Sequence, residues 1–331
     1  MTPRERFLRA LNREATDIPA VGNPTSIVTA DLMEAAGVGF PEAHTSAEKM
    51  ARLAAAGHTI LGYDTIAPYF SVQQEAAAFG CAVDWGDREH MPAVRGHLFS
   101  APEDIRIPPD YLNRLPLKTV RDALAILKRE YGSHVALVGK VMGPWTLAYH
   151  LFGLEPFLVR LMDAPGEVEA ILHRLAKATV LFAQAQIDAG ADCLTLADHL
   201  TGDLCRAETY RDFLLPVHRR IRQQLDIPIV LHICGYTLDR LDYIAQTGFD
   251  AYHFESKNDP YQTVEITAGR MALVGNINNP ETLYRCKLEQ IDREVAAAID
   301  AGVNIMAPEC AVPLNTRAEA VARIVEAARR H

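Results

Sequence analysis

Three joints in the second half of the sequence share one form: an amphipathic helix ends at a glycine, and an apolar strand follows at once. They read Asp188-Ala-Gly-Ala-Asp192, Gln246-Thr-Gly-Phe-Asp250 and Asp300-Ala-Gly-Val-Asn304. Glycine ends helices well because it adopts the left-handed backbone conformation at little cost. The strands that follow are apolar throughout, which is typical of parallel strands covered on both faces. The joints therefore predict repeated βα units around a parallel sheet.

The same alternation extends over residues 117–331. Strands are expected at 134–141, 191–197, 227–232, 251–255, 271–275 and 303–307, with helical segments between them, and a short apolar run at 18–21 adds a strand near the N-terminus. No Gly-x-Gly-x-x-Gly motif follows a strand, so an open nucleotide-binding sheet is not supported. The chain of 331 residues is long enough for a barrel of about 250 residues with an extension. We predict an α/β fold, a single (β/α)8 (TIM) barrel domain.

The N-terminal third of the sequence is less regular. The first residues, to about residue 13, predict an amphipathic helix in which Thr2 is the cap and Phe7 and Leu11 lie on one face. A second helix is expected at about 46–56. Residues 60–115 hold several prolines and only short apolar runs. We therefore predict a helical and irregular N-terminal extension, with an insertion or lid at about 60–115.

The charge balance limits the partners of the chain. It has 33 Lys and Arg against 42 Asp and Glu, a formal net charge of −9. Nucleic-acid binding requires a basic surface, and an anionic membrane would repel this chain, so neither partner is expected. The sequence contains no long apolar run and no apolar signal core at the N-terminus, which predicts a cytoplasmic protein. The six cysteines are scattered singly, so a functional cysteine is expected to be a metal ligand or a nucleophile rather than half of a disulfide.

Soft metal ligands follow two of the predicted strands. In a (β/α)8 barrel the active site lies at the C-terminal ends of the strands. His232 and Cys234 are two residues apart at one strand end, so both side chains leave the same face, and Cys310 follows another strand. One imidazole and two thiols suit zinc with a fourth position left open. The alternative is that each cysteine is a small core residue, which is our interpretation of Cys81, Cys193, Cys205 and Cys286.

Several segments carry a resemblance to a known family. They are residues 6–11 (Arg-Phe-Leu-Arg-Ala-Leu), 56–63 (Ala-Gly-His-Thr-Ile-Leu-Gly-Tyr), 79–81 (Phe-Gly-Cys), 142–144 (Met-Gly-Pro), 231–235 (Leu-His-Ile-Cys-Gly), 275–276 (Gly-Asn) and 307–310 (Ala-Pro-Glu-Cys). On these motifs the chain resembles, from end to end, the methylcobamide:coenzyme M methyltransferases of the uroporphyrinogen decarboxylase superfamily. The resemblance implies the same barrel and one catalytic zinc held by His232, Cys234 and Cys310.

The resemblance also implies a reaction. An acceptor thiol, with coenzyme M as the first candidate, would bind zinc as a thiolate. It would attack the methyl group of a methyl–cobalt(III) corrinoid carried by a separate protein and leave cobalt(I). Tetrahydrofolate is an alternative acceptor, and no feature of the sequence assigns a sulfonate or a pterin. A further alternative is a protein that binds zinc or the corrinoid carrier without turnover, because a fold does not guarantee a function.

Two positions depart from relatives within the superfamily. The decarboxylases carry an early Arg-Gln-Ala-Gly-Arg stretch, whereas residues 18–26 here read Ile-Pro-Ala-Val-Gly-Asn-Pro-Thr-Ser and offer no arginine to a porphyrin carboxylate. Decarboxylation of a tetrapyrrole is therefore disfavoured. Glu309 stands beside Cys310 where the methyltransferases more often have glycine, which places the geometry of this loop in question.

Other polar and aromatic residues near strand ends complete the predicted site. Glu255 is expected as a displaceable fourth zinc ligand or a partner that orients His232, the alternative being a solvated rim carboxylate. The remaining candidates are Asp198 and Asn276 as catalytic residues, and His199, Trp145 and Tyr69 as residues that contact the cofactor. The alternatives are turn or capping roles for the polar residues and core positions for the aromatic ones.

Overall fold

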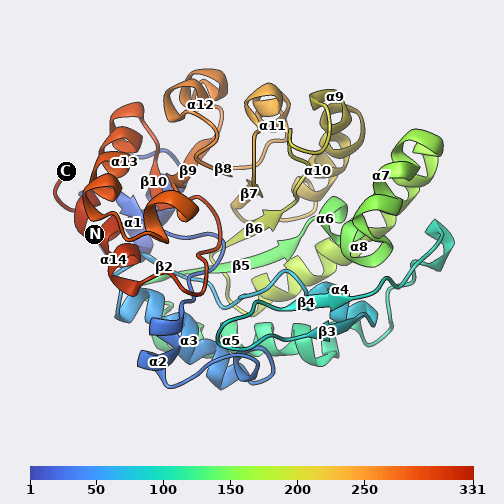
Figure 1. Ribbon diagram of the computed structural model, residues 1–331, viewed down its shortest axis with the longest axis horizontal. Coiled ribbons are helices and arrows are strands. Elements are labelled where there is room, and N and C mark those ends of the chain that lie inside the picture. Colours follow the sequence, from blue (N-terminus) through green and yellow to red (C-terminus); the bar gives the residue numbers. More distant parts are fainter.

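Eight parallel strands form the centre of the molecule. The computed structural model describes residues 1–331, and its main sheet has the strand order β1-β10-β9-β8-β7-β6-β5-β2. The strands are β1 (Ala20–Val21), β2 (Thr65–Ile66), β5 (Ala136–Met142), β6 (Cys193–Ala197), β7 (Ile229–Ile233), β8 (Ala251–Phe254), β9 (Ala272–Ile277) and β10 (Ile305–Pro308). Helices surround this sheet, as Figure 1 shows. The predicted (β/α)8 barrel is confirmed.

The barrel closes between its first two strands. Asp64 N donates to Val21 O over 2.8 Å, and the Asp64 carboxylate accepts a hydrogen bond from Val21 N over 3.0 Å. Asn23 N adds a third bond, to the Thr65 hydroxyl, over 3.1 Å. The structure thus places β2 in the barrel wall, so the beginning of the predicted insertion at 60–115 is part of the barrel itself.

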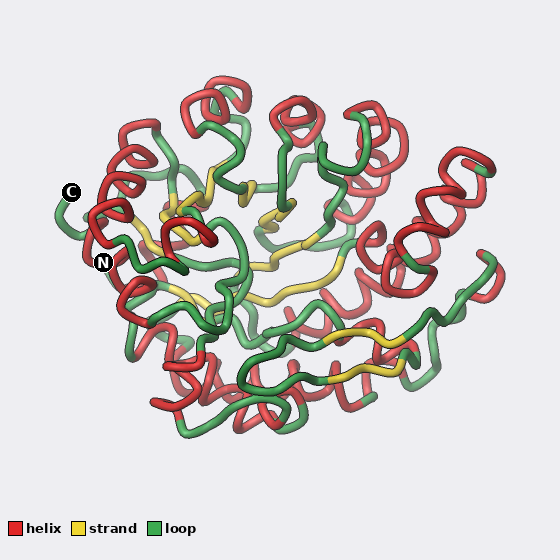
Figure 2. The backbone as a smooth tube through the Cα atoms, viewed as in Figure 1, coloured by secondary structure: helices red, strands yellow, loops and turns green.

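The rest of that segment lies outside the barrel wall. It comprises α4 (Gln74–Phe79), an antiparallel hairpin of β3 (Ala82–Asp84) and β4 (Ala93–Arg95), and short 3-10 turns. In Figure 2 the hairpin strands lie apart from the barrel strands. Its function as a lid stays a prediction.

The helices follow the predicted alternation closely. They are α1 (Pro3–Leu11), α2 (Ala30–Ala36), α3 (Ala47–Thr59), α5 (Leu115–Tyr131), α6 (Pro144–Phe152), α7 (Leu154–Asp163), α8 (Pro165–Asp188), α9 (Ala207–Thr209), α10 (Leu215–Arg222), α11 (Leu241–Ala245), α12 (Pro260–Thr267), α13 (Leu288–Ala301) and α14 (Ala318–Ala328). At the three repeated joints Gly190, Gly248 and Gly302 have φ of +109°, +81° and +97°. The predicted glycine-terminated joints are confirmed, since only glycine adopts these angles at little cost. None of the helices is both long and apolar enough to cross a bilayer.

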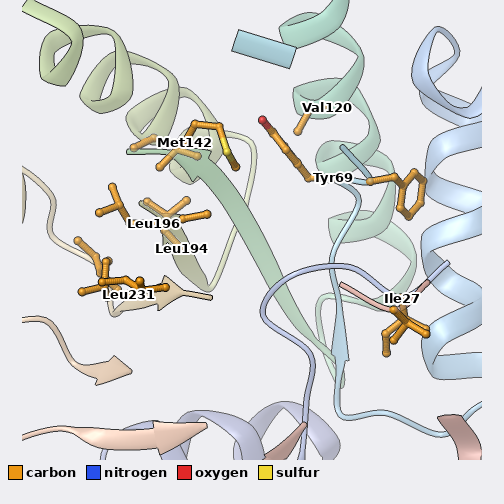
Figure 3. Packing of buried hydrophobic residues seen from close by; sticks show 14 of the residues in the cluster. Ile27, Tyr69, Val120, Met142, Leu194, Leu196 and Leu231 are labelled. Carbon is orange, nitrogen blue, oxygen red and sulfur yellow. The ribbon is translucent and has the colours of Figure 1, made fainter. Parts of the chain in front are cut away.

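Alternation along the strands separates two apolar layers. Residues that face outward pack under the helices, and Figure 3 shows Leu194 and Leu196 of β6 with Leu231 of β7 in this layer. Residues that face inward near the N-terminal ends of the strands form a smaller cluster with Phe7 and Leu11 of α1. Helix α1 therefore seals the bottom of the barrel and leaves the opposite end as its mouth.

The cysteines that were expected to be core residues differ in burial. Cys193 is fully buried in the inner cluster, as predicted. Cys81, Cys205 and Cys286 are half-buried and pack against the outer layer. None of the three contributes a ligand atom at the barrel mouth.

A buried histidine makes the stability of this fold depend on pH. His44 lies between Phe40 and Trp85, with ring centroids 4.1 and 5.3 Å away, and neither of its ring nitrogens has a hydrogen-bond partner. Burial lowers its pKa to about 3. The unfolded chain takes up a proton near pH 6.5. Stability is therefore lost as the pH falls from about 6.5 toward 3.

Replacing His44 by phenylalanine should remove this pH dependence. Between pH 7 and pH 5 the wild type should lose about 2 kcal/mol of unfolding free energy through His44, and His44→Phe should lose that much less. Urea denaturation at both pH values measures the difference. The exposed terminal His331→Phe is the control and should behave as the wild type. Equal pH dependence in wild type and His44→Phe would contradict the assignment.

Candidate metal centre

Three soft donor atoms meet at the barrel mouth. His232 Nε2 lies 3.1 Å from Cys234 Sγ and 3.3 Å from Cys310 Sγ, and the two sulfurs are 3.1 Å apart. Both cysteines are free thiols. His232 is 1% exposed, whereas the two cysteines are half-buried, so the cluster lies at the junction of the core and the mouth.

Strand geometry explains why the three side chains converge. Side chains alternate between the two faces of a strand, so His232 in β7 and Cys234 just beyond it both point into the barrel. Parallel pairing of β10 with β9 extends past the strand end, where Glu309 N donates to Ile277 O over 2.9 Å. Cys310 follows at once and is thereby held over the mouth. The predicted convergence of these residues is what the structure shows.

The donor set fits a tetrahedral zinc ion. With Zn–S near 2.3 Å and Zn–N near 2.0 Å, tetrahedral ligand atoms lie about 3.5 Å (N to S) and about 3.8 Å (S to S) from one another. The observed separations of 3.1–3.3 Å are shorter than these by about 0.2–0.7 Å. One nitrogen and two sulfurs are the ligand types that zinc prefers, and three protein ligands leave one position open.

The two thiols lie 3.1 Å apart and share a hydrogen bond in which either sulfur can be the donor. This contact lowers the pKa of Cys310 and holds the pKa of Cys234 well above its usual range. Burial raises the pKa of Cys234 further. Of the two, Cys310 therefore loses its proton more easily and becomes the thiolate, the form that binds a metal.

His253 orients the histidine ligand. His232 Nδ1 donates to the His253 carbonyl oxygen over 3.3 Å, which leaves Nε2 as the atom that faces the two sulfurs. The His253 ring lies 4.5 Å from the His232 ring, and its Nε2 donates to Pro308 O over 2.8 Å. Burial holds the pKa of His232 well below its usual range, so the imidazole is neutral and can bind a metal. The sequence analysis missed His253, whose only signal was its place two residues before Glu255.

His199 lies beside the ligands. Its Nδ1 accepts a hydrogen bond from Cys234 N over 3.3 Å, and its ring meets His232 edge-on at 5.3 Å. Ligand atoms of His199, His232 and Cys234 all lie within 4.8 Å of one another. Because Nδ1 accepts, Nε2 carries the proton and acts as a donor. The contact of His199 with the cofactor stays a prediction.

Glu255 contacts the loop that carries Cys234. Its carboxylate accepts a hydrogen bond from Gly235 N, and its negative charge raises the pKa of Cys234. Asn276 lines a cavity of about 1000 Å³ beside the mouth. Its amide donates to Asn258 O over 3.2 Å. The catalytic roles of Glu255 and Asn276 stay predictions.

Asp198 has a structural role in the fold, and its catalytic role stays a prediction. The residue is fully buried. One carboxylate oxygen accepts a hydrogen bond from Thr146 N over 2.7 Å, and the other lies 3.0 Å from His218 Nε2. Both oxygens are committed to holding α6 and α10 against the barrel. The inward residues of β6 end at Ala197, so the next side chain points outward.

The corrinoid contacts of Trp145 and Tyr69 also stay predictions. Both side chains are fully buried. Trp145 Nε1 donates to the Tyr149 hydroxyl, and the indole packs edge-on against Phe157 with ring centroids 5.0 Å apart. Tyr69 belongs to the core cluster, where Figure 3 shows it, and its hydroxyl donates to Glu75. Neither ring is exposed at the surface of this structure.

Lys140 is a charged residue that the sequence analysis missed. It lies in β5 and is only 3% exposed, and its Nζ stands 4.5 Å from the centre of the Tyr69 ring. Burial lowers its pKa to about 8, while the negative charges of Cys310, Glu75 and Cys234 oppose this shift. The available signal was a single lysine inside an otherwise apolar strand.

Glu309 ties three loops of the mouth together. It is 3% exposed, and its carboxylate accepts hydrogen bonds from Ser256 N over 2.9 Å and from Asn279 N over 2.8 Å. These residues follow β8 and β9, whereas Glu309 follows β10. Glu309 stands at a position where the methyltransferases more often have glycine, and its carboxylate therefore anchors the loop that carries Cys310.

Comparisons with known proteins place the chain in a family. The sequence model of the uroporphyrinogen decarboxylase (URO-D) family matches residues 2–331. The chain belongs to this family. It is 31% identical over 336 residues, covering 100% of this chain and 98% of the relative, to the methylcobamide:CoM methyltransferase MtbA of Methanosarcina acetivorans. A solved methyltransferase structure from Methanosarcina mazei matches with a TM-score of 0.96 at 30% identity, covering 100% and 99% of the two chains. The predicted resemblance is confirmed.

The decarboxylases of the family match less of the chain. The uroporphyrinogen decarboxylase of Gloeobacter violaceus is 32% identical over 173 residues, which cover 49% of this chain and 49% of the relative. The methyltransferase MtbA matches 100% of this chain, whereas this decarboxylase matches about half.

Removing the Glu309 carboxylate should loosen the mouth. Glu309→Ala leaves two buried N–H groups without an acceptor, so the unfolding free energy should fall by about 2–5 kcal/mol, as measured by urea denaturation. Glu309→Gln keeps one acceptor oxygen and should lose less. If Glu309→Ala were as stable as the wild type, the loop would be held by other contacts.

Proposed function

We propose that the chain is a zinc-dependent methyltransferase that moves a methyl group from a methylated corrinoid protein to a small thiol, with coenzyme M as the first candidate acceptor. The observation that carries this proposal is the cluster of His232, Cys234 and Cys310 at the barrel mouth, with donor atoms 3.1–3.3 Å apart. It is supported by full-length similarity to relatives named as methylcobamide:CoM methyltransferases.

The protein residues prepare the site for this chemistry. His232, Cys234 and Cys310 would hold the ion, and His253 fixes the nitrogen that His232 presents. Zinc at this position would stabilise a thiolate at neutral pH, where a free thiol is mostly protonated. Glu255 accepts a hydrogen bond from Gly235 N and would act as a displaceable fourth ligand or as a support for the Cys234 loop. The half-buried His199 would offer an N–H donor next to the ligands.

The methyl donor is proposed to arrive on another protein. The mouth is the open end of the barrel, because α1 packs against the opposite end. A corrinoid bound to a carrier protein can therefore meet the acceptor only at the C-terminal ends of the strands. Trp145 and Tyr69 are buried, so residues exposed on the rim would meet the corrinoid ring first.

Zinc binding is tested by metal analysis of the purified protein. Wild type should contain about one zinc per chain, and Cys310→Ala should lose most of it, because one of three protein ligands is missing. Cys193→Ala is the matched control, since Cys193 is a buried cysteine at the other end of the barrel. A wild type without zinc, or full zinc content in Cys310→Ala, would contradict the proposal.

Methyl transfer is tested with methylcobalamin as a minimal donor. We expect the visible spectrum to show loss of the methyl group when coenzyme M is present, and the rate to fall more than about 100-fold in Cys234→Ala. Tetrahydrofolate in a parallel assay distinguishes the alternative acceptor. If zinc-loaded wild type removes no methyl group from the donor when either acceptor is present, the result would support a binding protein without turnover instead.

A further inference from the structure

Cys234 and Cys310 are the only two cysteines of the chain whose sulfur atoms meet. Their Sγ atoms lie 3.1 Å apart. All six cysteines are free thiols, and no contact joins any other two of them. The S–S bond of a disulfide is about 2.05 Å long, so the two sulfurs need to approach by only about 1 Å to form one.

Both cysteines lie where a small movement breaks no strand pairing. β7 ends at Ile233 and β10 ends at Pro308, so each cysteine lies beyond the last residue of its strand. The Glu309 carboxylate holds the backbone just before Cys310. Rotation about the Cα–Cβ bond of a cysteine moves its sulfur and leaves the backbone in place. The sulfurs can therefore approach while the strands and the Glu309 contacts are retained.

The pair is accessible to a small oxidant. Disulfide exchange requires that a cysteine sulfur meet a sulfur of the oxidant. Cys234 and Cys310 are half-buried at the open end of the barrel, whereas Cys193 is fully buried in the inner cluster that α1 closes. A small molecule that enters the mouth therefore reaches the pair and does not reach Cys193.

The contact is compatible with two chemical states that exclude each other. In a tetrahedral zinc site the two sulfurs would lie about 3.8 Å apart, and in a disulfide they would lie about 2.05 Å apart. The observed 3.1 Å is between these values. A disulfide also removes both thiolates, which leaves His232 as the only one of the three protein ligands. Formation of the bond and retention of the metal are therefore alternatives.

We propose that Cys234 and Cys310 form a reversible disulfide that switches the metal centre off under oxidising conditions. The oxidant is a small-molecule disulfide, RS–SR. The bond itself does not depend on methyl transfer, whereas its effect on the metal rests on the zinc site of the proposed function. The state of the site would then follow the balance of thiols and disulfides around the protein.

The reaction is two successive thiol–disulfide exchanges. One cysteine thiolate attacks RS–SR, forms a mixed disulfide and displaces RS⁻, which takes up the proton of that cysteine as RSH. The second cysteine then attacks the first cysteine sulfur and displaces the second RSH. Both cysteine sulfurs are oxidised, both sulfurs of RS–SR are reduced, and the two thiol protons leave with them.

The bond is tested by peptide mapping after oxidation. Zinc-loaded protein and protein stripped of metal with a chelator are each incubated with oxidised glutathione. In the stripped protein the peptides of Cys234 and Cys310 should be linked, with about 2 Da lost as two hydrogens leave. Dithiothreitol should reverse the change. A lasting glutathione adduct on either cysteine, or no reaction of the pair, would overturn the proposal.

Two variants provide matched controls. Cys234→Ser removes one partner and should retain glutathione on Cys310 as a mixed disulfide, because no second thiol is near to displace it. Cys286→Ser removes a half-buried cysteine without a sulfur contact and should form the Cys234–Cys310 bond as the wild type does. This contrast would assign the bond to the pair rather than to the general reactivity of half-buried thiols.

Zinc release separates this inference from the proposed function. In zinc-loaded protein the disulfide should form at least about 10-fold more slowly, because the metal holds both thiolates, and about one zinc per bond should pass to a chelating dye. Equal rates in loaded and stripped protein would overturn the switch. If the wild type binds no zinc but forms the bond, the thiol pair stands and the proposed metal site fails. If zinc-loaded protein transfers methyl groups but stripped protein forms no bond, the proposed function stands and the switch fails.

Discussion

The curvature of the sheet is the constraint on which the metal centre depends. The ligands come from β7 and β10, which are separated in the sheet by β8 and β9. In a flat sheet, three strand spacings of about 4.8 Å would hold the ligands about 14 Å apart. Here His232 Nε2 lies 3.3 Å from Cys310 Sγ, because closure turns the inward faces of both strands toward one axis. Asp64 maintains this closure by accepting from Val21 N and from Arg6 of α1.

The fold was largely predictable because its strongest signals are local. Gly190, Gly248 and Gly302 mark helix ends, and each is followed by an apolar strand in the structure. Strand β2 was missed because two residues carry too little pattern to be separated from the loops around them. Its place in the barrel is fixed by hydrogen bonds to residues 21 and 23, which are far away in sequence.

Site residues could be predicted where their ligand chemistry is distinctive. They could not be predicted where a role depends on the direction in which the side chain points. The His-x-Cys pair and a distant Cys were correctly brought together, because few other roles unite such residues at strand ends. Side chains alternate along β6, so Asp198 points outward where Ala197 points inward. The sequence could not show this, because it depends on where β6 ends. In the sequence His253 and Lys140 cannot be distinguished from core residues, because their positions near the metal ligands are set only when the strands close into a barrel.

Helix α1 has a consequence for the order of events at the mouth. Because Phe7 and Leu11 fill the lower end of the barrel, molecules reach the cluster from one side only. Under the proposed function, the small acceptor lies deeper than the carrier protein, which would cover the opening when it docks. The acceptor must then enter first and the carrier must leave before the product. The enzyme would follow sequential kinetics through a ternary complex rather than a ping-pong scheme.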